Sequence, residues 1–222
     1  MFLAGVTGLA GHAIARRLLD GYPDLRLRAC VHRTRPYCES PRLEYVNGDL
    51  RLPDDCRRML RGCDAAIMAA ASGGGAAVLN SEPWRQVNDN LFMAASFLEA
   101  CFLEKVRRVV LANSATLYQE CAGHVREEQL DLNQDPHPAY FGVGWVTRCV
   151  EKLCAFWRNQ GGMAIVIGRT SNIFGPYASF DPGRSNFIPA LIRKAVDRMD
   201  PFEVWGSPDV VRDVLYVEDF AR

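Results

Sequence analysis

The chain has 222 residues, of which 49% are hydrophobic, and its 26 basic and 26 acidic residues leave no formal net charge. This length and apolar content suit one full core, or one domain plus part of another. The neutral balance argues against nucleic-acid or membrane-surface partners. No apolar run approaches the ~20 residues that a membrane-spanning helix needs, and the N-terminus enters a strand without a signal peptide.

The eight cysteines are scattered through strand-like and helix-like segments, without C-x-x-C pairs or zinc-ligand spacing. Reduced thiols in the cytoplasm are the expected state, and no metal is expected. A redox-sensing reductase stays open as a minor alternative because eight thiols are many. The absence of paired spacing argues against it.

Strand-like and helix-like segments alternate along the chain. Strands are expected at residues 1–4, 25–31, 43–46, 65–71, 107–112 and 164–167, and helices from the first glycine turn to about residue 20 and at 53–61, 84–104 and 140–159. This alternation predicts the α/β class, with a doubly wound parallel Rossmann sheet and helices on both faces.

The regular alternation weakens after residue 168. We therefore expect a nucleotide-binding domain at residues 1–168 and the start of a smaller substrate lobe at 169–222, where prolines 176, 182 and 189 indicate loops. The last residues read as a strand entering a helix. The lobe is therefore expected to continue beyond the sequence given.

Three glycines, Gly5, Gly8 and Gly11, lie between the first strand and the first helix in a G-x-x-G-x-x-G spacing. Such a turn brings backbone N–H groups and a helix N-terminus close to a pyrophosphate. Together with the intervening Thr7, Leu9 and Ala10, the turn predicts a dinucleotide cradle. The alternative is that the glycines serve packing alone.

The residues after the second strand discriminate between the two nicotinamide dinucleotides. Arg33 and Arg35 stand there without an acidic residue, which favours the 2′-phosphate of NADP(H) over the ribose hydroxyls of NAD(H), although NAD(H) stays possible. Both arginines could instead be solvated loop charges. Asp49 is expected near the adenine, or else as a plain turn residue. Leu50, Ala69, Ala70 and Ala71 complete the predicted strand-end site.

Four further stretches carry a family resemblance: 113–118, the helix that starts at Tyr140, 169–176 and 212–219. With the glycine turn they resemble the extended short-chain dehydrogenase/reductases of the NAD-dependent epimerase/dehydratase type, in the branch of the GDP-L-fucose synthases. The segments 69–75 with Asn80, 84–88, 180–193 and 204–207 resemble that branch as well.

The resemblance implies hydride transfer between a nicotinamide and a ring carbon, C4 above all, of a nucleotide-diphosphate sugar. It implies Tyr140 as acid/base, Ser114 as its hydrogen-bonding partner and Asn88 at the cofactor. The implied substrate contacts are Ser72, Asn172, Asn186, Trp205 and Arg212. Trp205 could instead pack in a core, Asn172 could cap a turn, and Arg212 could pair with Asp213 or Glu218. A homodimer through the two long helices is also implied.

The sequence departs from the family pattern at Gly144, where the resemblance implies a lysine one helical turn after Tyr140. A tyrosine that titrates near ~10 needs such a cation to work at neutral pH. A non-catalytic protein that keeps the nucleotide pocket is therefore the second hypothesis. A Gly144→Lys substitution is expected to raise turnover if the first one holds.

Two further departures from the family involve residues 115, 116 and 186. Thr116 and Asn186 stand where the fucose synthases carry a Cys and a His for epimerisation, and Ala115 and Thr116 replace the dehydratase Asp-Glu pair. Epimerisation beside a ketone and elimination are therefore not supported by these positions. The first hypothesis is a reductase or epimerase that acts at C4 of the sugar. His12, His124 and His137 are expected at the surface or in loops.

Overall fold

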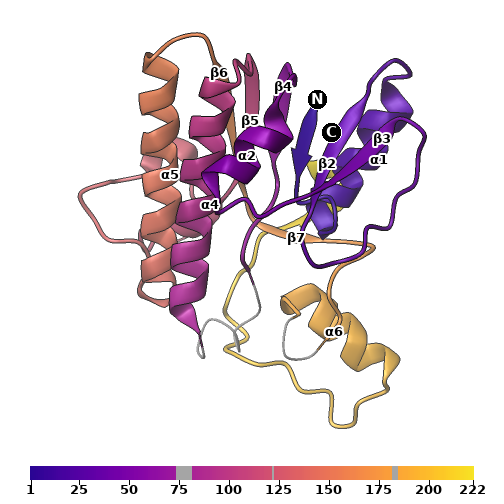
Figure 1. Ribbon diagram of the computed structural model, residues 1–222. Coiled ribbons are helices and arrows are strands. Elements are labelled where there is room, and N and C mark those ends of the chain that lie inside the picture. The colour runs from indigo at the N-terminus through magenta and orange to yellow at the C-terminus, as the bar shows by residue number, and fades with distance from the viewer. Residues whose placement is uncertain (74–81, 122, 182–184) are drawn as a thin grey trace.

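The computed structural model describes residues 1–73, 82–121, 123–181 and 185–222. Six parallel strands form one sheet in the order β3-β2-β1-β4-β5-β6, and helices cover both faces (Figure 1). The strands are β1 (Phe2–Ala4), β2 (Leu27–Val31), β3 (Leu43–Asn47), β4 (Ala65–Met68), β5 (Arg108–Ser114) and β6 (Ala164–Thr170). The predicted doubly wound sheet is thereby confirmed.

The helices alternate with the strands as predicted. They are α1 (Leu9–Gly21), α2 (Pro53–Leu60), α4 (Pro83–Leu103) and α5 (Phe141–Asn159). The predicted bounds mostly differ by one to three residues, because an apolar run does not show where the ladder ends. At β4 the apolar run continues to residue 71, but the strand ends at Met68 and the following alanines leave the sheet.

The polar sequence at 119–138, between β5 and α5, predicts a loop. The connection formed by residues 115–140 contains the short 3₁₀ helices Ala115–Leu117, Glu127–Gln129 and Pro138–Tyr140. Arg148 of α5 holds this connection in place, since its guanidinium donates to the carbonyls of Leu117 and Gln134. The connection therefore packs against the N-terminal half of α5.

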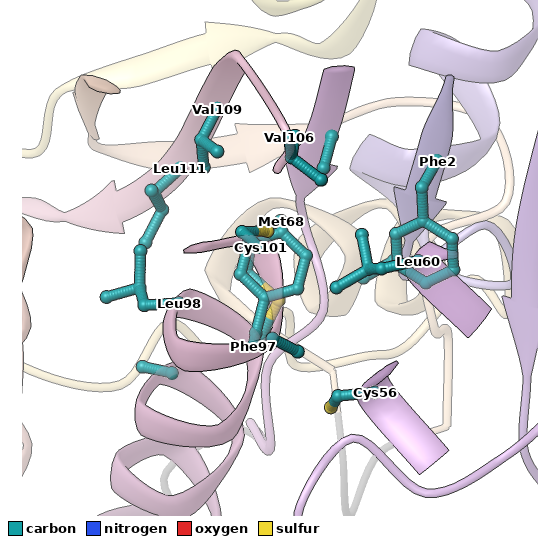
Figure 2. Close-up of a cluster of buried hydrophobic side chains, with 14 of the residues drawn as sticks. Phe2, Cys56, Leu60, Met68, Phe97, Leu98, Cys101, Val106, Val109 and Leu111 are labelled. Carbon is teal, nitrogen blue, oxygen red and sulfur yellow. The ribbon is translucent and has the colours of Figure 1, made fainter. Parts of the chain in front are cut away.

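The larger of two buried clusters lies between the sheet and α2, α4 and α5. Phe97 and Cys101 of α4 are fully buried and gather with Met68, while Phe2 and Leu60 lie beside them (Figure 2). A smaller cluster, formed by residues of β1, β2 and α1, covers the opposite face. Both faces of the sheet are thus sealed, so that its strand ends are left for a site.

The residues after β6 form a second, smaller unit. β7 (Asn172–Phe174) and β8 (Val214–Tyr216) pair in parallel, α6 (Phe187–Val196) lies between them in sequence, and α7 (Val217–Phe220) follows. Figure 1 shows α6 set apart from the six-stranded sheet. α7 returns to α1, where Glu218 lies 3.9 Å from Arg16. The chain ends close to its beginning (Figure 1).

The expectation that His12 lies at the surface is wrong. Its side chain is 4% exposed, because Tyr177 and Tyr37 pack over the first turn of α1. His124 is exposed and His137 is half-buried, as expected. Among the described residues, no helix combines the length and the apolar character needed to cross a membrane.

Candidate functional site

The glycine turn connects β1 to α1 at the carboxyl end of the central strand. Gly5 has a φ of +92°, and a Cβ there would lie 2.6 Å from the backbone of Ala69 and Ala70. A Cβ at Gly11 would lie 2.0 Å from the carbonyl oxygen of Gly5. These two glycines are therefore required by packing, as the alternative interpretation proposed.

Gly8 differs from the other two glycines. Its Cβ would approach only the carbonyl oxygen of Gly5, at 3.4 Å, and the residue is exposed at the N-terminus of α1 without a side-chain cap. The first N–H groups of a 13-residue helix thus open toward solvent beside a strand end. A pyrophosphate fits this position because backbone donors and the helix dipole both favour an anion.

A pocket of about 290 Å³ adjoins this turn. It brings together eight residues that the sequence predicted for the cofactor or substrate: Gly5, Thr7, Arg33, Asp49, Leu50, Ala70, Ala71 and Ser72. It is also lined by Cys30, His32, Gly48, Arg51, Arg85, Asp89 and Met93. Parallel strands present their carboxyl ends on one edge, which explains why segments so distant in sequence meet here.

Asp49 is held by a residue that the sequence did not single out. Its carboxylate accepts hydrogen bonds from the backbone and the guanidinium of Arg51, the shortest at 2.6 Å, and His32 lies 3.8 Å away. These hydrogen bonds from Arg51 lower the pKa of Asp49 to about 2. Arg51 also reaches Asp89 of α4 at 3.0 Å. The geometry therefore supports the turn interpretation of Asp49, with its oxygens already occupied.

Asn88, Ala69, Leu9 and Ala10 do not line the pocket. Asn88 shares an exposed face of α4 with Trp84 and Phe92, one helical turn away on either side. Arg85 and Asp89 lie on the face that lines the pocket. The sequence pattern predicts where the helix lies but not which face points inward. The contact of Asp89 with Arg51 shows that face.

Asn90 positions the segment that follows β4. Its side chain accepts from the backbone N–H of Ser72 at 2.8 Å and donates to the Ser72 carbonyl at 2.9 Å. The pair of bonds fixes the rim of the pocket from α4. Asn80 and most of the predicted glycine loop at 73–75 lie outside the described residues.

Ser114 ends β5, and its Oγ accepts hydrogen bonds from the backbone N–H of Thr116 at 3.2 Å and from the Thr116 hydroxyl at 3.1 Å. A hydroxyl that accepts twice still has its own proton to donate. With these two bonds accepted, the Ser114 proton is left for a further acceptor.

Tyr140 stands at the N-terminus of α5, where its half-buried ring lies 5.9 Å from that of His137. Its hydroxyl lies 3.3 Å from Nη1 of Arg212. The predicted substrate residue Arg212 thus meets the predicted acid/base residue across 72 positions of sequence. The alternative was an ion pair of Arg212 with Asp213 or Glu218. Among the described residues neither pair is formed, and Glu218 lies 3.9 Å from Arg16 instead.

The remaining predicted substrate residues lie in the second unit. Asn172 donates to the carbonyl of Asp213 at 3.0 Å and so ties β7 to the start of β8. Asn186 is exposed at the N-terminus of α6. Trp205 is 80% exposed, with Lys194 Nζ 4.7 Å above its ring. The alternative that Trp205 packs in a core is therefore wrong.

Gly144 has no room for a side chain. A Cβ there would lie 2.4 Å from Cβ of Pro136 and 2.6 Å from the carbonyl oxygen of Thr116. The following turn of the same face carries Arg148, which is 2% exposed and bonded to the carbonyls of Leu117 and Gln134. Residues 115–138, the connection between β5 and α5, thus cover the face of α5 on which the resemblance implies a lysine.

The strand order, the glycine turn and the pocket at the strand ends define a doubly wound α/β protein of the Rossmann type. The chain belongs to the NAD dependent epimerase/dehydratase family, whose model matches residues 1–222. This confirms the predicted resemblance.

Relatives with curated names match almost the whole chain. A GDP-L-fucose synthase from Sinorhizobium fredii is 29% identical over 99% of this chain and 67% of its own length. A GDP-mannose 3,5-epimerase from rice is 28% identical over 98% of this chain and 58% of its own length. The chain therefore spans about three fifths to two thirds of these relatives.

Solved structures share the fold. The GDP-L-fucose synthetase from Naegleria fowleri, bound to NADP, superposes with a TM-score of 0.79 at 21% identity, over 99% of this chain and 69% of that one. The UDP-glucose 4-epimerase from Thermotoga maritima reaches a TM-score of 0.84 at 16% identity, over 99% and 70% of the two chains. At such identities the likeness concerns the fold.

Proposed function

We propose that the chain binds a nicotinamide dinucleotide, with NADP(H) favoured over NAD(H). The observation that carries this proposal is the pocket beside the glycine turn, where Gly8 leaves space at the N-terminus of α1 and Arg33 lines the wall. The pyrophosphate would lie at the helix N-terminus. The adenosine 2′-phosphate would pair with Arg33. The NADP-bound fucose synthetase with the same fold supports the choice.

We further propose that the bound substrate is a nucleotide-diphosphate hexose. The names of the curated relatives support this substrate class. Asn172, Asn186, Trp205 and Arg212 are the proposed contacts, and Ser72 joins them from the pocket rim. The chain spans only part of the length of these relatives, so their substrates are carried over as a proposal.

The proposed reaction is reduction of a ketone at C4 of the sugar. The hydride for the carbonyl carbon would come from NADPH when it is bound. Ser114 donates a hydrogen bond to the carbonyl oxygen, and Tyr140 gives that oxygen its proton, so that a ketone becomes an alcohol. Thr116 holds the Ser114 hydroxyl oriented through its two hydrogen bonds. Neither Thr116 nor Asn186 titrates near neutral pH, which favours reduction over epimerisation.

A second candidate function is nucleotide binding without turnover. The observation that favours it is the filled space at Gly144, which prevents a lysine at the family position. Measurement of binding and turnover on the same protein separates the two. Turnover at a rate typical of the family excludes the non-catalytic candidate, whereas tight NADPH binding without turnover supports it.

A binding experiment tests the cofactor proposal. NADPH and NADH are titrated by fluorescence against wild type, Arg33→Ala and Arg35→Ala. Loss of one charge-assisted bond weakens NADPH binding by about tenfold in Arg33→Ala and leaves NADH binding unchanged. Arg35, an exposed arginine of the same loop that does not line the pocket, is the matched control. Equal affinities for both dinucleotides, unaffected by Arg33→Ala, would refute the preference.

We also propose that the protein is cytoplasmic and forms a homodimer. The location is supported by the eight cysteines, all of which are free thiols in the structure. The dimer is supported by the exposed aromatic residues along α4 and α5.

A further inference from the structure

The helix that carries Tyr140 offers its hydroxyl no lysine. Space is missing at Gly144, and the guanidinium of Arg148 is buried among backbone carbonyls. A phenol that gives up a proton leaves a negative charge, which is costly without a nearby cation or donor. The compensation has to come from another element.

Arg212 supplies a cation from the second unit. Its Nη1 lies 3.3 Å from the Tyr140 hydroxyl. A guanidinium keeps its charge at every working pH and donates through rigid N–H groups. It can therefore hold the phenol oxygen before proton transfer and the phenolate after it, through a charge-assisted hydrogen bond.

A hydrogen bond from a side chain to the neighbouring backbone helps to position Arg212. Asn172 of β7 donates to the carbonyl of Asp213, the next residue, at 3.0 Å. The parallel register pairs Asn172 with Val214 and extends to Phe174 opposite Tyr216. Since β7 follows β6 after a single residue, the main sheet itself locates the segment that carries Arg212.

We propose that Arg212 is the cation that serves Tyr140 in place of a lysine on α5, and that Asn172 is its positioning residue. The inference rests on the proposed reduction. As the hydride reaches the carbonyl carbon, the O–H bond of Tyr140 breaks and its proton moves to the sugar oxygen. The phenolate that remains is held by Arg212 until water returns a proton. The acid/base pair is thus assembled from both units.

The rival role for Arg212 is to bind the diphosphate of the substrate alone. Kinetics separates the two roles, because a binding contact that is equal in ground and transition states changes KM, whereas a proton-transfer contact changes kcat. We compare wild type, Arg212→Gln, Arg212→Lys and Asn172→Ala in NADPH-dependent reduction of a nucleotide 4-ketohexose. Arg193→Gln, an exposed arginine on α6, is the matched control.

We expect Arg212→Gln to lower kcat by about a hundredfold, in the range of a lost acid/base contribution. Arg212→Lys should recover most of kcat, and Asn172→Ala should lower it by a smaller factor. Arg193→Gln should match wild type. An Arg212→Gln variant with raised KM and unchanged kcat overturns the proposal in favour of diphosphate binding.

A second measurement does not need turnover. In protein labelled with ¹³C at tyrosine Cζ, the Tyr140 signal is assigned by its loss in Tyr140→Phe. It should shift in Arg212→Gln and stay in place in Arg193→Gln. An unmoved signal in Arg212→Gln refutes the contact. If wild type shows no turnover but its Tyr140 signal differs from that of Arg212→Gln, the proposed reduction is refuted. The contact between Arg212 and Tyr140 is still supported.

Discussion

His12 lies in the first turn of α1 beneath two aromatic rings. Its ring centroid is 4.1 Å from that of Tyr177 and 6.0 Å from that of Tyr37. Within the part of the chain that the structure describes, neither ring nitrogen has a hydrogen-bond partner. Burial lowers the pKa of His12 below its ordinary value, Arg16 lowers it further, and Glu218 opposes them. The folded protein therefore holds this ring neutral.

This burial predicts a loss of stability in acid. Because the pKa of His12 is below 6.5 in the fold, the unfolded chain binds more protons once the pH falls below about 6.5. The contribution of His12 to stability is thus constant above that pH and decreases as the pH falls toward the folded pKa. His12→Phe keeps a ring but cannot titrate, so its free energy of unfolding should decrease less between pH values of about 7.5 and 5.

Urea unfolding at the two pH values measures this difference. Removal of the unpaired buried nitrogens should also raise the stability of His12→Phe at neutral pH by about 1 kcal/mol or more. His124→Phe, a change at an exposed histidine, is the control and should behave as wild type. The same pH dependence in His12→Phe and wild type would show that His12 is not responsible.

Gly144 carries a second prediction at the residue scale. A Cβ would overlap Pro136 and the Thr116 carbonyl, so Gly144→Ala should lower the free energy of unfolding by about 1–3 kcal/mol, the cost of overpacking. Gly144→Lys adds a longer side chain to the same clash. The expectation that lysine here raises turnover is therefore replaced by loss of stability and activity.

Gly21 provides the matched control for Gly144. It is the last residue of α1, and a Cβ there would meet no atom within 4 Å. Gly21→Ala should therefore leave stability unchanged or raise it slightly, since alanine is the better helix former. Chemical unfolding of both variants gives the comparison. If Gly144→Ala is as stable as Gly21→Ala, residues 115–138 can shift to accommodate a methyl group, and the predicted cost of overpacking is wrong.

At the scale of elements, α4 packs against the sheet and contributes buried side chains to the larger core. Phe97 has no exposed surface and lies between the sheet and α2 (Figure 2), whereas Phe92 on the same helix is 54% exposed. Phe97→Ala should cost about 3–5 kcal/mol of folding free energy through lost burial and the cavity it leaves. Phe92→Ala in the monomer should cost far less. Thermal or urea unfolding of the two variants checks this. Equal losses of folding free energy would contradict the burial of Phe97 and the exposure of Phe92.

The elements of the main sheet are largely predictable from the sequence, because each shows a hydrophobic periodicity or an apolar run and many are bounded by Gly or Pro. The sequence predicts the strand at 65–71 too long, because apolar alanines continue past Met68, the last residue that pairs with β1 and β5. The 3₁₀ turns in the 115–138 connection were missed because Arg148, 14 residues away from Gln134, holds them. A domain boundary at residue 169 stays a prediction; β6 itself continues to Thr170.

For the site, the sequence predicts which strand ends meet, but it does not predict which side chains contact one another. The glycine turn, Arg33 and Ser72 meet at one pocket because sheet topology brings strand ends together. The occupation of Asp49 by Arg51, the approach of Arg212 to Tyr140 and the closed space at Gly144 depend on side-chain directions. No local pattern encodes these directions.

At the scale of the whole molecule, α4 and α5 lie side by side on one flank (Figure 1). Each presents an exposed stripe of large side chains at helical spacing. The aromatic members are Trp84, Phe92 and Phe102 on α4 and Phe141, Trp145 and Phe156 on α5, which are 36–57% exposed. Large exposed apolar patches on soluble proteins mark interaction sites, so a partner is expected to cover these side chains. Two copies joined through this flank would bury both stripes in an antiparallel or crossed helix pair.

This arrangement predicts that the full chain has twice the monomer mass of 24.8 kDa in solution. Phe92→Asp and Phe156→Asp together should convert it to a monomer, because a carboxylate in each stripe would be desolvated at the interface. Val196→Asp, a more exposed apolar position at the end of α6, is the control and should stay dimeric. Size-exclusion chromatography with light scattering gives the masses. A wild-type monomer excludes the dimer, and a dimer that survives both substitutions assigns its interface to another face of the molecule.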